Sequence, residues 1–163
     1  SSVRAQDRHV LESLFDELKR ASDFSLDGNP RRFAELVEEI ARSGDPAIVP
    51  RLLGFFDDQT SFPDAMFAIV HAVEQFDDTV YLTGLFSMIE ETWAASPEWL
   101  MVLHYRILNS PDTMKRYREM VGRLSRRQKV ALRDLLVRIK NNEPEFSVRC
   151  TVLIKAMSRF SFF

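Results

Sequence analysis

The stretch DPAIVPRLLGFFDDQTSFPDAMFAIVHAVEQF, residues 45–76, decides the fold class because its apolar residues are spaced for two short helices around a polar turn. The first helix is predicted over 46–56, and its apolar positions are Leu52, Leu53 and Phe56. Pro50 lies inside that range and is expected to kink the helix, because proline lacks a backbone donor. The second helix is predicted over 63–76, with small residues spaced for close packing at Ala65, Ala68 and Ala72.

This helix pair resembles a HEAT-like repeat, in which a proline interrupts the first helix and an aspartate, here Asp57, follows it. The resemblance is clearest over residues 45–76. It implies antiparallel pairs stacked into a short, curved α-solenoid with an extended binding surface.

The rest of the chain repeats one helix-start signal. Five prolines each precede a stretch with helical periodicity, and the residue before each proline can cap a helix or end the preceding one. The residues before these prolines are Asn29, Asp45, Ser96, Ser110 and Glu143. No alternating strand pattern separates them, so the chain is predicted to be all-α, with about 8 to 9 helices. The predicted helices are 3–22, 30–42, 46–56, 63–76, 79–94, 97–108, 111–124, 126–141 and 144–160.

Length and composition favour one folded domain over residues 1–163. The chain is 45% hydrophobic and 28% charged, as in ordinary globular proteins. Its single cysteine, Cys150, excludes a disulfide framework and favours a reducing, cytoplasmic location. No apolar run reaches the roughly 18 residues that span a bilayer, and no signal peptide is expected.

The charges are divided unequally along the chain, although the net charge is only -2. Residues 52–105 contain nine carboxylates and no lysine or arginine, whereas residues 106–163 contain 14 basic and five acidic residues. A surface of one sign repels itself, so a basic partner explains the middle segment better than folding does.

The partner-binding surface is predicted on the middle helices, whose carboxylates are expected to project together. Helix capping is the competing explanation for the aspartates at helix ends. The predicted site contains Asp57, Asp58, Asp64, His71, Glu74, Asp77, Asp78, Tyr81, Glu90, Glu91 and Glu98. Trp93 and Trp99 would add anchoring area wherever they are exposed.

A second resemblance lies in SPEWLMVLHYRILNSPDTMKRYREMVGRL, residues 96–124. The opening Pro97, Glu98 and Trp99 and the later run 106–109 resemble the immunity protein 30 family of bacterial contact-dependent inhibition and polymorphic toxin systems. The resemblance implies a cytoplasmic antitoxin that binds and blocks a cognate toxin domain as a monomer in a 1:1 complex. The acidic surface favours a nuclease as that toxin, because nucleases bind phosphate through basic clefts.

Two other binding functions remain open. A HEAT-like adaptor that binds a basic peptide would need the same acidic surface. A nucleic-acid-binding protein could use the basic residues of the last third, although the middle carboxylates would repel the nucleic-acid backbone. No catalytic motif, metal site or cofactor site is predicted, because the three histidines lie on separate predicted helices and no nucleophile has a neighbouring base.

Overall fold

The computed structural model describes residues 2–158, and within them every regular element is helical. The α-helices are α1 (Ser2–Ala21), α2 (Asn29–Ala41), α3 (Ile48–Leu53), α4 (Pro63–Glu74), α5 (Asp78–Ser87), α6 (Ile89–Ala95), α7 (Pro97–Leu108), α8 (Pro111–Met120), α9 (Arg126–Asn142) and α10 (Ser147–Met157). Two short 3-10 helices, η1 (Val121–Arg123) and η2 (Pro144–Phe146), precede α9 and α10. The prediction of an all-α chain of packed helix pairs is confirmed.

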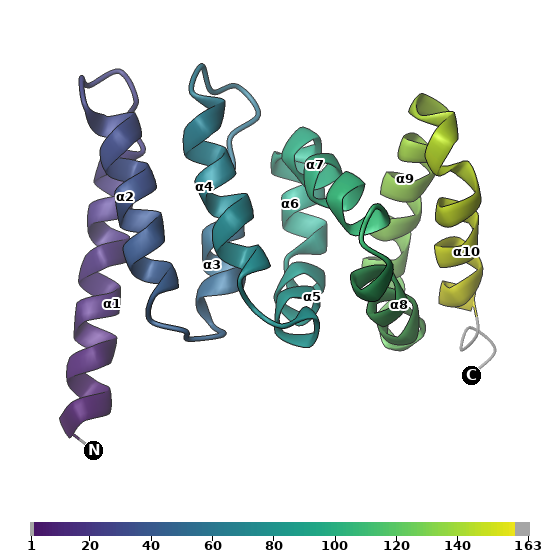
Figure 1. The fold of residues 1–163 in the computed structure, drawn as a ribbon, viewed down its shortest axis with the longest axis horizontal. Helices are drawn as coiled ribbons and strands as arrows, with labels where there is room; N and C mark the ends of the chain where they lie inside the picture. Colours follow the sequence, from purple (N-terminus) through teal and green to yellow (C-terminus); the bar gives the residue numbers. More distant parts are fainter. Residues whose placement is uncertain (1, 159–163) are drawn as a thin grey trace.

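The helices form a row of pairs that runs from the N-terminus to the C-terminus (Figure 1). Within pairs, α1 contacts α2, α3 contacts α4, α6 contacts α7 and α9 contacts α10. Neighbouring pairs are joined mainly by α2 with α4, α3 with α5, and α6 with α9. Because successive helices run up and down, the α1–α2, α3–α4, α6–α7 and α9–α10 connections lie at one edge of the row, the top in Figure 1.

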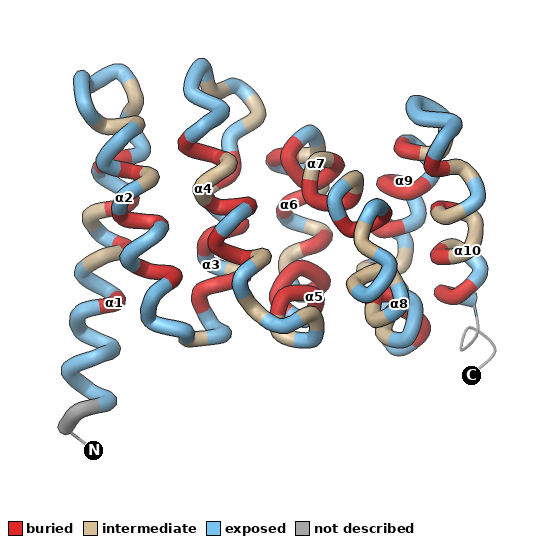
Figure 2. The backbone as a smooth tube through the Cα atoms, in the orientation of Figure 1, coloured by how far each residue is buried: buried red, intermediate tan, exposed pale blue. Residues whose placement is uncertain are grey.

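The core is a continuous apolar layer between the helices, and buried positions face inward along the whole row (Figure 2). Helix α2 shows the pattern most clearly, because Phe33, Leu36, Val37 and Ile40 follow the helical repeat and all are fully buried. At the α3–α5 contact, Gly84 lies against Val49, and a Cβ at Gly84 would be 2.5 Å from Val49 Cγ1. In the described residues no helix is both long and apolar enough to cross a membrane.

Pro50 does not kink a helix, contrary to the prediction. Helix α3 begins at Ile48, so Pro50 lies in its first turn, where the missing amide would have no helical acceptor. The residues before it form turns of the 3-10 type, in which the Ile48 amide bonds the Asp45 carbonyl. The helix predicted over 46–56 is therefore only six residues long.

The helix predicted over 79–94 is two helices, α5 and α6, separated at Met88. The Met88 backbone has φ −109° and ψ 11°, outside the helical range. The Ser87 hydroxyl donates to the Gly84 carbonyl at 2.7 Å and thereby competes with the backbone for a helical acceptor. The apolar repeat continues through the break, which is why the spacing alone predicted one helix.

Candidate functional site

The structure separates the predicted carboxylate surface into groups. Asp57, Asp58, Asp64 and Glu98 lie around the α3–α4 connection and the start of α7. Glu74, Asp77 and Asp78 lie at the other end of α4 and the start of α5. Helix α4 has 12 residues, so at about 1.5 Å per residue its ends are roughly 16 Å apart. The expectation that all these carboxylates project together is therefore wrong.

The carboxylates at the α4–α5 connection bind groups within the protein. Both oxygens of Glu74 accept from Arg106 of α7, at 2.7 and 2.8 Å. Asp77 caps α5 by accepting from the Val80 amide at 2.9 Å, and the half-buried Asp78 accepts from the Thr113 hydroxyl at 2.8 Å. These three side chains therefore stabilise the junction of α4, α5, α7 and α8. For Asp77 the role is the helix capping that the competing explanation predicted.

Asp58 also has a structural role, although it lies in the other group. Its two oxygens accept from the backbone amides of Glu98 and Trp99, at 2.9 and 3.2 Å, so it caps the N-terminus of α7 from 40 residues away. Ser96, at the N-cap position itself, makes no cap bond and instead donates to the Phe56 carbonyl at 2.8 Å.

The remaining predicted residues occupy different environments. Asp57, Asp64, His71, Glu91 and Glu98 are exposed, and Glu90 is half-buried on α6. Tyr81 is only 3% exposed and its hydroxyl has no hydrogen-bond partner, so Tyr81 is a core residue and not a surface anchor.

The two tryptophans also offer little surface. Trp99 is buried, stacked on Phe56 and contacted edge-on by Phe67. Trp93 is half-buried beneath the guanidinium of Arg138. Neither provides the exposed anchoring area that the sequence left open.

A more extensive acidic surface lies along one edge of the row, and we call it the acidic end. It comprises the four connections at residues 22–29, 54–64, 95–99 and 142–147, which contain no lysine, arginine or histidine. Its carboxylates are Asp23, Asp27, Asp57, Asp58, Asp64, Glu98, Glu143 and Glu145. The connections at the opposite edge are mixed in charge, with Arg42 beside Asp45 and with Arg123 and Arg126.

Contacts link successive parts of the acidic end. The rings of Phe24 and Phe62 meet edge-to-face at 5.7 Å, which joins the α1–α2 and α3–α4 connections. The Asp58 cap joins the α3–α4 connection to α7. Burial and then the charges of Glu143 and Glu98 raise the pKa of Tyr105, so both carboxylates lie near that residue.

None of the eight carboxylates of the acidic end forms an ion pair with a residue that the structure describes. Among the nine carboxylates in residues 52–105, Glu74, which lies outside the acidic end, is the one with an ion-pair partner in the described chain. Basic residues do flank the acidic end on helices, where Arg31 and Arg32 pair with Glu35 and Glu17, and Lys19 and Arg20 close α1. The connections themselves carry only acidic charges.

Four carboxylates of the acidic end escaped the sequence prediction: Asp23, Asp27, Glu143 and Glu145. They lie outside the segment that lacks basic residues, so a charge count along the chain does not group them. The sequence could have grouped them through the order of the helices. In a row of antiparallel pairs, the loops that join the two helices of each pair lie at the same edge.

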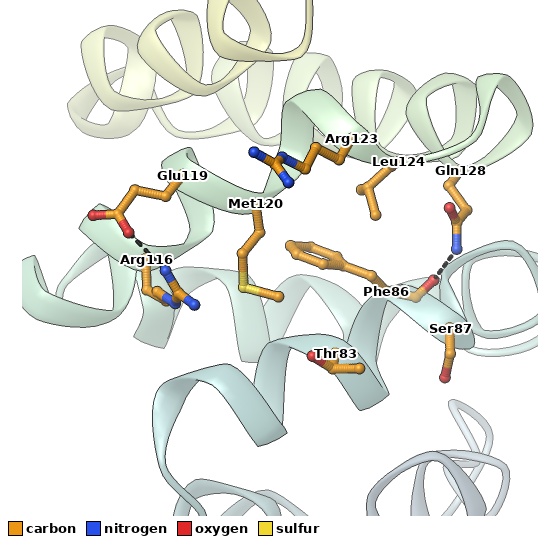
Figure 3. A pocket seen from close by; sticks show the side chains of 9 residues that line it. All are labelled: Thr83, Phe86, Ser87, Arg116, Glu119, Met120, Arg123, Leu124 and Gln128. Atoms are coloured by element: carbon orange, nitrogen blue, oxygen red, sulfur yellow. Dashed lines mark hydrogen bonds and ion pairs between the residues drawn. The ribbon is translucent and has the colours of Figure 1, made fainter. Parts of the chain in front are cut away.

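A hollow lies between α5, α8, η1 and the start of α9 (Figure 3). It measures about 700 Å³, and Phe86, Met120 and Leu124 form its apolar surface. Arg116 at its rim is held by Glu119 and by the Thr79 hydroxyl, at 2.8 and 2.9 Å. Its lining has both charge signs and contains no histidine or cysteine.

The buried His104 and Cys150 are poorly suited to acid–base or nucleophilic chemistry. Burial lowers the pKa of His104 to about 4, and its ring nitrogens bond Leu100 and Tyr117. Burial raises the pKa of the Cys150 thiol to about 11, which makes it a poor nucleophile. Within residues 2–158 no three His, Cys, Asp or Glu side chains gather as a candidate metal site.

Comparison with known families gives one match. The family model described as Immunity protein 30 matches residues 22–117, more than half of the 163-residue chain. The matched range contains the first three connections of the acidic end. No curated protein and no solved structure matches the chain.

Proposed function

The chain belongs to the immunity protein 30 family, and we propose that it neutralises a cognate toxin domain by covering a basic cleft with its acidic end. The observation that carries the proposal is the set of four adjacent connections with eight carboxylates and no basic residue. The chain acts as a binding protein without catalysis, in the cytoplasm and in a 1:1 complex.

Electrostatics supports this choice of surface. Carboxylates gathered on one edge repel each other and destabilise the folded state, so their presence needs a reason other than folding. Asp57, Asp64 and Glu98 are exposed and form no ion pair with any residue in 2–158, which leaves their charges available to a partner. Complementary charge raises association rates to about 10⁸ M⁻¹s⁻¹ or more at low salt.

The proposed partner is a nuclease domain. Enzymes that bind nucleic acid need lysine and arginine clefts to hold phosphate groups. A rigid row of carboxylates resembles the charge pattern of a nucleic-acid backbone and would compete for such a cleft. We expect the reading frame immediately upstream to encode a large secreted protein that ends in a basic domain, here called the upstream toxin domain.

The test is rescue of cells that express the upstream toxin domain. The decisive variant is the triple substitution Asp57→Asn, Asp64→Asn and Glu98→Gln, which removes three exposed charges. It leaves the Glu74, Asp77, Asp78 and Asp58 interactions intact, and asparagine at 57 retains the oxygen that accepts from the Gln59 amide. We expect this variant to fold normally and to lose most protection.

The matched control removes three exposed carboxylates from α1 and α2, as Asp16→Asn, Glu38→Gln and Glu39→Gln. The control changes the net charge by the same amount as the acidic-end variant. Full protection by the control would therefore show that the position of the lost charges matters, and not their number. We also expect the wild-type affinity to fall steeply as salt rises. Full protection by the acidic-end variant would place the interface elsewhere.

A further inference from the structure

The α1–α2 and α3–α4 connections enclose a small hollow within the acidic end. It measures about 310 Å³ and is lined by Phe24, Phe33, Phe55 and Met66, with Gly54 and Asp57 also at its wall. This volume is at the lower limit of about 300 Å³ for pockets that hold small molecules, so the hollow has room for one long side chain.

The lining is chemically specific. The rings of Phe24 and Phe55 are partly exposed, and the buried ring of Phe33 supports them from behind at 5.3 Å and 6.2 Å. Asp57 is the one charged residue in the lining. Aromatic faces attract cations and pack against aliphatic stems, and a carboxylate binds the charged head.

Asp57 is held in place for this role. One carboxylate oxygen accepts from the Gln59 amide at 2.9 Å, and the Asp57 amide donates to the sulfur of Met66 at 3.3 Å. The side chain is exposed and forms no ion pair with the described part of the chain. Its second oxygen is therefore available to a ligand.

The facing connection is also ordered by side-chain bonds. Asp23 accepts from the Ser25 amide and hydroxyl, and Asn29 donates to the Asp23 carbonyl at 2.9 Å. A site that is already ordered binds with a smaller loss of conformational entropy.

We propose that this hollow receives a single lysine or arginine side chain of the toxin domain, with its stem against the rings of Phe24 and Phe55 and its charge on Asp57. The inference rests on the proposed function and specifies one contact within it. It places an anchor at the N-terminal part of the acidic end, while the other carboxylates act mainly through the long-range field.

The experiment measures the dissociation constant of the upstream toxin domain for full-length variants by calorimetry. Asp57→Asn removes the charge, and Gly54→Leu fills the hollow without changing any charge. We expect each to weaken binding about tenfold or more, because central, desolvated contacts dominate affinity. Asp64→Asn, on the same edge but outside the hollow, should weaken binding by about threefold or less.

Gly54→Ala is the control for folding and for the size of the added side chain. Gly54 has an ordinary helical φ of −67°, and a Cβ there meets only the Arg51 carbonyl, at 3.4 Å. We expect this variant to fold as the wild type does and to weaken binding less than Gly54→Leu. Thermal melting checks that Gly54→Leu and Asp57→Asn remain folded.

A double-mutant cycle between this protein and the toxin domain completes the test. Replacing each lysine and arginine of the toxin domain with methionine in turn should reveal one position whose effect disappears in Asp57→Asn but persists in Asp64→Asn. Wild-type affinity in Gly54→Leu, together with lost affinity in the triple acidic-end variant, would overturn the inference and leave the proposed function standing. Failure of the wild-type chain to bind that domain would overturn both.

Discussion

Arg106 and Glu74 form a two-bond ion pair, with Arg106 Nε and one terminal nitrogen donating to the two carboxylate oxygens at 2.7 and 2.8 Å. Residues 52–105 contain no lysine or arginine, and Arg106 is the first one after them. Arg106 binds Glu74, the one carboxylate of residues 52–105 that has an ion-pair partner among the described residues. The pair joins α4 to α7 across 32 residues.

Removing either member of this pair should have a modest effect on stability. The side chains of Arg106 and Glu74 are 44% and 27% exposed, so water screens their attraction. A double-mutant cycle with Arg106→Gln and Glu74→Gln should give a coupling free energy of about 0.5–1 kcal/mol in urea unfolding. The coupling should shrink in high salt, and a salt-independent value would contradict an electrostatic origin.

Asp58→Ala should destabilise the protein more than Asp57→Ala, although the two are neighbours. Asp58 satisfies two amides at the start of α7, and loss of an N-cap costs about 1–2 kcal/mol. Asp57 makes only a local turn bond. Equal unfolding free energies for the two variants would show that the α7 cap contributes nothing measurable.

Gly84→Ala should destabilise the α3–α5 contact. The new Cβ would lie 2.5 Å from Val49 Cγ1 and 2.8 Å from Val49 Cβ, so one helix must shift, at about 1–3 kcal/mol. Val49→Ala in the same chain should recover part of the loss. Gly54→Ala introduces the same methyl group without such a clash and should leave the melting temperature nearly unchanged.

His104 should make the protein sensitive to acid. Its Nδ1–H donates to the Leu100 carbonyl at 3.0 Å, so its Nε2 accepts from the Tyr117 hydroxyl at 2.7 Å. Burial lowers the folded-state pKa from 6.5 to about 4, so between these values the unfolded chain binds a proton that the folded chain does not. The unfolding free energy should therefore fall by about 3 kcal/mol as pH drops from 7 to 4.

The matched variants for this prediction are His104→Gln and His71→Gln. His71 is exposed on α4, so His71→Gln is the control for removing a histidine from the surface. His104→Gln should lower stability at pH 7 but flatten the decrease between pH 6.5 and 4. An unchanged pH slope in His104→Gln would assign the acid sensitivity to other groups.

Much of the fold followed from local signals. The proline-based starts placed α7 and α8 at Pro97 and Pro111, because proline at the first helical position leaves no amide unsatisfied. The capping chemistry did not follow from the sequence. Ser96 and Ser110 occupy N-cap positions but cap no backbone amide, because the Ser96 hydroxyl donates to the Phe56 carbonyl and the Ser110 hydroxyl bonds the Thr113 hydroxyl.

The site was less accessible to sequence reasoning for a physical reason. The sequence shows which residues are charged but not which charges meet, and Glu74 and Asp78 are bound by α7 and α8. Asp58 looked like a surface charge because the backbone amides that donate to it lie about 40 residues further along the chain. Whether the acidic end binds a toxin stays a prediction, and its location follows from the alternation of connections.

The long-range cap on α7 also bears on how the protein folds. In a row of helix pairs each pair contacts only its neighbours, so pairs can in principle fold one after another. Here the first turn of α7 lacks acceptors for its amides until Asp58 arrives, and Ser96 ties the same turn to Phe56. The second and third pairs therefore form one cooperative unit, and hydrogen exchange should protect α4 and α7 together rather than separately.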